Sequence, residues 1–111
     1  RVAIESHVLH LPKSALASSA LARLMNNEEV SKEELLELAK DENWQVRAKV
    51  AKNSNLTKEI LEILAKDKDS YVRAFVAKNP NLPKEILELL ATDKNYYVRA
   101  LVSKNPNYQK L

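Results

Sequence analysis

The residues that could do catalytic chemistry lie close to the N-terminus. His7 and His10 have an i, i+3 spacing that could bring both rings to one metal ion, but Glu5 is the only carboxylate near them. The hydroxyls near these histidines belong to Ser6, Ser14, Ser18 and Ser19. No oriented base or oxyanion hole accompanies them. We therefore expect solvated or partly buried histidines, and we predict no catalytic residue, no metal site, no cofactor and no enzymatic activity.

Two residue types are missing, and their absence excludes whole classes of site. The 111 residues contain no glycine and no cysteine. Phosphate-binding loops, dinucleotide fingerprints, nucleophile elbows and EF-hand loops need glycine, because the backbone there turns with positive φ or approaches a ligand closely. Without cysteine the chain has no disulfides, thiolate zinc sites, cysteine-bound iron–sulfur clusters or cysteine nucleophile.

The length and polarity of the chain fit one small domain with a modest core. Its apolar runs are too short to cross a bilayer, and the N-terminus lacks the charged and apolar regions of a signal peptide. These features predict a cytoplasmic protein with no membrane partner.

An internal repeat with a period of 26 residues dominates the sequence. The triplet Val-Arg-Ala begins at Val46, Val72 and Val98, and the units superimpose without insertions. The three units are residues 30–55, 56–81 and 82–107. Residues 1–29 form a degenerate unit, as expected for a terminal capping repeat, and residues 108–111 are the start of a truncated repeat or a tail.

Each unit is predicted to form two short helices. The second helix follows a good N-cap residue and ends at an asparagine, which in the absence of glycine is the natural residue for a left-handed C′ position. The expected N-caps are Asn43, Asp69 and Asn95, and the expected helix C-caps are Asn53, Asn79 and Asn105. Because such short helices are marginal alone in water, the units must stack on one another. We predict an all-α fold, an α-solenoid of two-helix repeats.

The unit LAKDKDSYVRAFVAKNPNLPKEIL, residues 64–87, resembles the variant leucine-rich repeat, and the resemblance covers residues 30–107. It rests on the Leu-Ala-x-Asp step, the following Val-Arg pair, the Val-Ala step and the Asn-Pro ending. The six-residue spacing from Asp67 to Arg73 is also similar to HEAT repeats, which we rank second. The first family implies a right-handed superhelix in which an α-helix alternates with a shorter helix that can be 3₁₀.

The period departs from the variant family, whose units have about 24 residues. Two extra residues per unit could allow a full second α-helix, as in HEAT-like proteins, so the helix type stays open. Neither family implies a catalytic activity. Some HEAT-like proteins bind DNA or act as DNA glycosylases, but no motif here carries that activity over.

Arginine and aspartate form a repeating ladder for which we predict a structural role. Its members are Asp41, Arg47, Asp67, Arg73, Asp93 and Arg99. Each arginine can pair with the aspartate of its own unit across the turn, or with the aspartate of the adjacent unit. Arginine suits partly buried carboxylate pairs, which favours this reading over partner binding.

The second helices also carry the residues best suited to partner binding. Segments 44–55, 70–81 and 96–107 contain seven basic and no acidic residues. We select Trp44, Lys52, Tyr71, Lys78, Tyr97 and Lys104 as partner-binding candidates. The alternative is that these residues bind no partner. The lysines would then cap helix ends or be solvated. The aromatic rings, Tyr96 included, would pack on a neighbouring unit.

The leading functional hypothesis is a non-enzymatic scaffold that binds a protein or peptide along its repeat face, as stacked helical repeats commonly do. The alternative is binding to nucleic-acid backbone through the basic second helices, which would weaken steeply with salt. A third reading is a structural spacer in a longer chain.

The repeat pattern also predicts which positions are buried. Val50, Val76 and Val102 should lie between units, whereas Lys58 and Lys84 should be exposed. Because the pattern stops in mid-unit, we expect Leu101, Val102 and Leu89 to be more open than their equivalents, and we expect self-association through the last unit or continuation into more repeats.

Overall fold

The structure, a computed structural model, describes the backbone of residues 12–109 and the side chains of residues 19–109. In this part of the chain there are eight helices and no strand, which confirms the predicted all-helical fold. The helices are α2 (Pro12–Met25), α3 (Lys32–Leu38), α4 (Trp44–Ala51), α5 (Lys58–Ala65), α6 (Ser70–Ala77), α7 (Lys84–Ala91), α8 (Tyr96–Ser103) and α9 (Pro106–Gln109). His7 and His10 lie outside the described residues, as do Ser6 and the side chains of Ser14 and Ser18.

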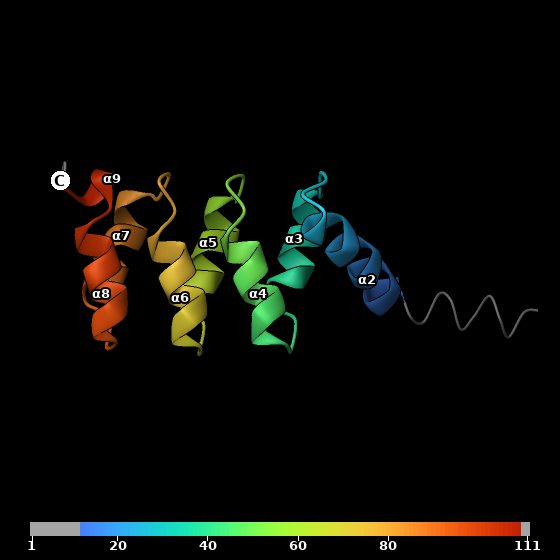
Figure 1. Cartoon of the computed structure of the whole chain (residues 1–111), viewed down its shortest axis with the longest axis horizontal. Coiled ribbons are helices and arrows are strands. Elements are labelled where there is room, and N and C mark those ends of the chain that lie inside the picture. Colours follow the sequence, from blue (N-terminus) through green and yellow to red (C-terminus); the bar gives the residue numbers. More distant parts are fainter. Residues whose placement is uncertain (1–11, 110–111) are drawn as a thin grey trace, which may run out of the picture.

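The helices form an elongated two-layer stack with extents of 59 × 25 × 21 Å (Figure 1). The second helices α4, α6 and α8 pack side by side in one layer, and α5 packs on α7 in the other. Within a unit the two helices also pack on each other, and α2 packs on both α3 and α4 at the N-terminal end. All three second helices are α-helices of eight residues, so the 26-residue unit holds two α-helices.

The first N–H groups of a helix have no carbonyl acceptor within the helix, and at each second helix a polar N-cap side chain accepts one of them. The side-chain oxygens of Asn43, Asp69 and Asn95 accept the N–H two residues later at 2.8 Å. Two of the first helices, α3 and α5, use a different cap, and α7 begins after Pro83 without a side-chain cap. Ser31 and Glu34 form a reciprocal capping box at the start of α3, and Thr57 accepts the Ile60 N–H at the start of α5.

One continuous apolar core runs along the stack between the two layers. The valines predicted to lie between units are 0%, 0% and 1% exposed at Val50, Val76 and Val102. The expectation that Val102 is more open than its equivalents is therefore wrong. Leu101 and its equivalent Phe75 are both half-buried, whereas Leu89 is exposed and its equivalent Ile63 is half-buried. Lys58 and Lys84 are exposed, as predicted. Burial of apolar side chains between units therefore supplies the stability that these short helices lack alone.

The ends of the second helices differ from the prediction. The C-cap residues are Lys52, Lys78 and Lys104, with right-handed backbone angles, and the asparagines follow one position later. Among the described residues the only positive φ belongs to Asn27, at 60°. Asn53, Asn79 and Asn105 are therefore neither C-caps nor left-handed residues.

A tightened last turn explains why no left-handed residue is needed. The N–H of each asparagine donates to the carbonyl three residues earlier at 2.9 Å, as in Asn79 to Val76. The asparagine side-chain oxygen then accepts the N–H two residues later, at 2.8 Å for Asn53 and Asn79 and 2.9 Å for Asn105. This hydrogen bond from the backbone N–H to the side chain forms an Asx turn, which directs the chain toward the next unit.

The left-handed ending occurs once, at α2. There the Glu28 N–H donates to the Arg23 carbonyl at 2.7 Å, and the Asn27 N–H donates to the Leu24 carbonyl at 3.1 Å. These two bonds define a Schellman motif with Asn27 at C′. Helix α2 thus ends by a different mechanism from α4, α6 and α8.

Candidate interaction surface

Two arginine–aspartate pairs join neighbouring units across the second-helix layer. Arg47 Nε and Nη2 donate to the two carboxylate oxygens of Asp67 at 2.7 and 3.1 Å. Arg73 holds Asp93 in the same way at 2.8 and 3.1 Å. Of the two pairings that the sequence allows, the structure therefore contains the one with the adjacent unit's aspartate.

The same arginines are also tied to their own unit. Arg47 Nη1 donates to the Asp41 carbonyl at 2.6 Å, and Arg73 Nη1 donates to the Asp67 carbonyl at 2.7 Å. A planar guanidinium can thus bond a backbone carbonyl at one edge and a carboxylate at another. Both arginines are only 6% exposed, so they are committed to the stack and are not available to a partner.

The pKa values of these groups follow from the pairing. The hydrogen bond with Asp67 raises the pKa of Arg47, against the opposing effect of burial. Burial alone would raise the pKa of Asp93, but the hydrogen bonds from Arg73 and the Asn95 N–H, together with the nearby positive charges, lower it below its ordinary value. The carboxylate is therefore ionised at neutral pH.

The two ends of the ladder differ from its middle. Arg99 is exposed, and its Nη1 donates to the Asp93 carbonyl without a carboxylate partner in the described part of the chain. The Asp41 carboxylate accepts the Asn43 N–H at 2.8 Å, but no arginine of the described part bonds it, because the position one period before Arg47 is Leu21.

A different ion pair joins α2 to α3. Arg23 makes a bidentate pair with Glu34, and it also donates to the Glu29 carbonyl at 3.1 Å. The hydrogen bond from Arg23, with those from Ser31, lowers the pKa of Glu34 to about 2. The sequence analysis missed this pair, since Arg23 is outside the repeating Val-Arg pattern.

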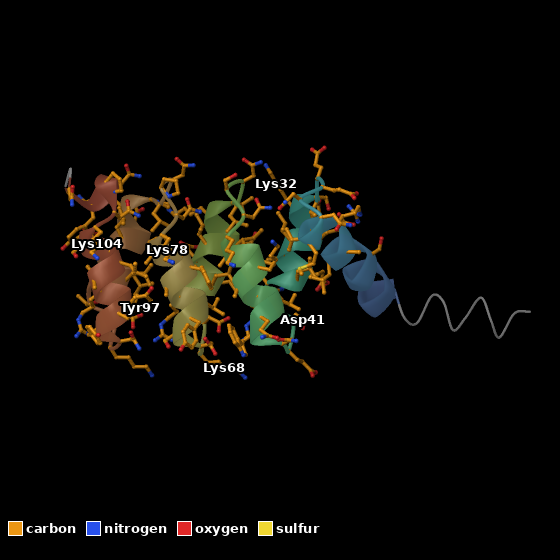
Figure 2. The ribbon with its side chains drawn as sticks, in the orientation of Figure 1. Lys32, Asp41, Lys68, Lys78, Tyr97 and Lys104 are labelled. Carbon is orange, nitrogen blue, oxygen red and sulfur yellow. The ribbon has the colours of Figure 1, made fainter. Side chains whose placement is uncertain are left out.

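A row of lysines lies at the C-terminal ends of the second helices. Lys52, Lys78 and Lys104 are exposed, and Figure 2 shows Lys78 and Lys104 at the same level near the upper ends of α6 and α8. Lys52 Nζ lies 4.6 Å and Lys78 Nζ 5.3 Å from the centroid of the Phe75 ring. Phe75 was not among the predicted site residues, although its i, i+3 spacing to Lys78 could have indicated the contact.

A row of aromatic side chains lies at the opposite, N-terminal ends of these helices. Trp44 is 38%, Tyr71 60%, Tyr96 74% and Tyr97 46% exposed. The Trp44 and Tyr71 rings stack across α4 and α6 with centroids 5.5 Å apart. Tyr97 lies at the end of α8 remote from Lys104 (Figure 2). The rings pack partly on neighbours, yet much of each remains open to solvent.

These two rows, together with Lys49 and Arg99, form what we call the second-helix surface. No aspartate or glutamate occurs in segments 44–55, 70–81 and 96–107. With Arg47 and Arg73 neutralised by buried carboxylates, five cations on this surface have no carboxylate partner in the described part: Lys49, Lys52, Lys78, Arg99 and Lys104. The surface can therefore attract anionic groups and offer aromatic contacts beside them.

A cleft of about 960 Å³ adjoins this surface at its N-terminal end. It lies between the loop that joins α2 to α3 and the loop that joins α4 to α5, and its lining includes Leu35, Lys49, Lys52 and Leu56. Lys52 thus belongs to both the lysine row and the wall of the cleft.

Within residues 12–109, no cluster of three or more histidine, cysteine, aspartate or glutamate side chains is arranged to bind a metal ion. His7 and His10 lie outside this range, so the metal prediction at these residues stays a prediction. None of the described helices is long and apolar enough to cross a membrane.

Comparison with known proteins supports the family resemblance. Residues 72–95 match the family model of the leucine rich repeat variant. The matched segment includes Arg73 and its partner Asp93 and runs from α6 through α7. No curated protein and no solved structure matches the chain. The resemblance identified from the repeat pattern is therefore confirmed over these residues.

Proposed function

We propose that this helical-repeat scaffold is non-enzymatic and binds a protein or peptide partner along the second-helix surface. The variant leucine-rich repeat resemblance supports a scaffold role. The observation that carries the proposal is the composition of this surface, with unpaired cations and exposed aromatic rings and no acidic residue. We also propose that units 30–55, 56–81 and 82–107 each contribute at least one cationic and one aromatic position to it.

The exposed aromatic rings favour a protein partner. Tyrosine and tryptophan bury a large area at small entropic loss and are enriched where proteins bind each other. Tyr71 and Tyr97 occupy equivalent positions one period apart, so an extended segment that runs along the stack meets a ring at successive units. The lysine row then contacts acidic side chains of the same segment.

The test is a selection of short peptides from a displayed library on the immobilised 111-residue chain. The selected peptides are then measured against a triple variant, Lys52→Gln, Lys78→Gln and Lys104→Gln. The matched control carries Lys40→Gln, Lys58→Gln and Lys84→Gln, which removes three exposed lysines outside the second helices and outside the cleft. We expect the first variant to bind at least about tenfold more weakly and the control to bind as the parent does.

Equal losses in the two triple variants would show that binding follows net charge and not this surface. Tyr71→Ala gives an independent reading, because it removes a ring without changing charge. Unchanged melting curves for all variants are the required control for folding.

The alternative function is binding to nucleic-acid backbone. It is favoured by the same acid-free surface, where lysines could contact phosphates and the Trp44–Tyr71 pair could stack on bases. A single-stranded oligodeoxythymidine and a DNA duplex, titrated at several salt concentrations, test it. Binding to the backbone predicts that the affinity falls steeply with salt concentration. In the lysine triple variant the slope of log affinity against log salt concentration should decrease by about 1 for each lysine that contacts a phosphate. No retention at low salt would remove this alternative.

A further inference from the structure

Helices α7 and α8 form one end of the stack, and some of their residues are less buried than the equivalent residues of the preceding unit. Four equivalent positions become more exposed there. The pairs are Ala65 and Ala91, Arg73 and Arg99, Ala74 and Ala100, and Ala77 and Ser103. The preceding unit is covered by the next one, because α6 packs on α8 and α5 packs on α7, and both Arg73 and the Ala77 carbonyl bond residues of that next unit.

Arg99 makes one of the two sets of contacts that Arg47 and Arg73 make, and it lacks the carboxylate partner. In Arg47 and Arg73, Nη1 bonds the carbonyl of the unit's own turn, and Nε and Nη2 hold the next unit's aspartate. Arg99 makes the first of these contacts, from Nη1 to the Asp93 carbonyl. Its Nε and Nη2 have no acceptor in the described part of the chain, so the guanidinium is held in place with two donors free.

We propose that the α7–α8 end binds a further two-helix unit of the same repeat type, and that Arg99 takes the carboxylate of that unit's turn aspartate in a bidentate bond. The two complete pairs show the chemistry of this occupant. In each, one aspartate oxygen also accepts the N–H two residues later, at 2.9 Å for Asp67 and 2.8 Å for Asp93. The occupant therefore carries an aspartate that begins an Asx turn before a helix.

Helix α9 packs on α7 and α8, but by its place in the repeat it is not a following first helix. Residues 106–109 of α9 are equivalent to 80–83, which connect α6 to α7. Ser103 stands where the preceding unit has a buried alanine. Its Oγ donates to the Ala100 carbonyl at 2.7 Å, so its hydroxyl needs no solvent when covered.

A second copy of this chain fits the surface less well. Stacking in register would place the N-terminal side of the second copy on α7 and α8. That side is covered by α2, which packs on α3 and α4. A further unit continues the interface that already joins α6 to α8, and this continuity decides between the two occupants.

The test uses the chain with a second copy of residues 82–107 inserted after Asn107, so that the added copy of Asp93 lies 20 positions beyond Arg99. We expect the added unit to be helical by circular dichroism and to raise the unfolding midpoint temperature, because it buries the open end. Arg99→Gln should lower the midpoint of the extended chain by about 4 °C or more, and that of the 111-residue chain by clearly less.

Lys104→Gln is the matched control, because it removes one positive charge from the same unit outside the proposed bond. It should shift the unfolding midpoint temperatures of the two chains by the same small amount. The proposal is overturned if the added unit leaves the midpoint temperature unchanged, or if Arg99→Gln lowers the midpoint temperatures of both chains equally. It is also overturned if sedimentation shows the 111-residue chain to be a dimer that Arg99→Gln dissociates, since the occupant is then a second copy.

Discussion

At the scale of single residues, Arg73 joins two units through a buried ion pair. It bonds its own turn and the carboxylate of the next unit, and the Arg73 and Asp93 side chains are 7% and 8% exposed. Removing the guanidinium leaves Asp93 buried beside an unfilled space, which is the costly way to break an ion pair. The three lysines of the row are exposed and have no comparable structural role.

We predict that Arg73→Ala lowers the free energy of unfolding by about 3 kcal/mol, measured by urea denaturation. Arg73→Lys should restore only part of this, because an ammonium group cannot reproduce the two parallel bonds. Arg99→Ala is the control, since the same residue type at the equivalent position has no carboxylate partner, and it should change stability by less than about 1 kcal/mol. Equal effects at Arg73 and Arg99 would contradict a structural role for the pair.

The acidic groups give the fold a pH dependence with a defined sign. Glu34 has a pKa of about 2 in the fold against an ordinary 4.5, and the pKa of Asp93 is also lowered. In this range the unfolded chain binds more protons than the folded chain, so stability is present above the ordinary pKa and is lost as pH falls toward the folded pKa. The urea midpoint should therefore decrease between pH 4.5 and about 2, and less steeply in Asp93→Asn. A midpoint that rises on acidification would refute the argument.

At the scale of helices, local sequence signals explain most of what could be predicted. The N-cap residues and the apolar periodicity act within a single helix, so the sequence locates the helices and the buried valines. The partner of each arginine depends on how units stack, and the sequence leaves both aspartates possible. Asparagine also favours two kinds of helix ending, a left-handed C′ residue and an Asx turn, and only the path of the chain into the next unit selects between them.

Glycine substitution tests this distinction between helix endings. Asn27 has a φ of 60°, so Asn27→Gly should be neutral or stabilising, because glycine adopts that angle without strain. Asn53 has no positive φ and its side chain accepts the Asn55 N–H, so Asn53→Gly should lower the free energy of unfolding by about 1 kcal/mol. Thermal melts of both variants provide the measurement. A stabilising Asn53→Gly would restore the left-handed assignment.

At the scale of the whole molecule, stability depends on contacts between neighbouring units, and these are not equal along the stack. The three later units share the arginine–aspartate pairs and the α4–α6–α8 layer. The N-terminal unit lacks this pair and is joined by Arg23 and Glu34, which are 34% and 24% exposed in their side chains. The cleft of about 960 Å³ also separates the loop before α3 from the loop before α5.

Hydrogen exchange should report this gradient. Because the first junction has a more exposed ion pair and an open cleft, α3 and the described part of α2 should open at lower free energy than α5, α6 and α7. Mass spectrometry of peptic fragments should then show faster amide exchange in residues 19–38 than in residues 58–91. Glu34→Gln should accelerate exchange in the first segment alone, because it removes the Arg23 pair without touching the later junctions. Uniform protection along the chain would mean that the stack unfolds as one cooperative unit, in which the weaker first junction has no separate effect.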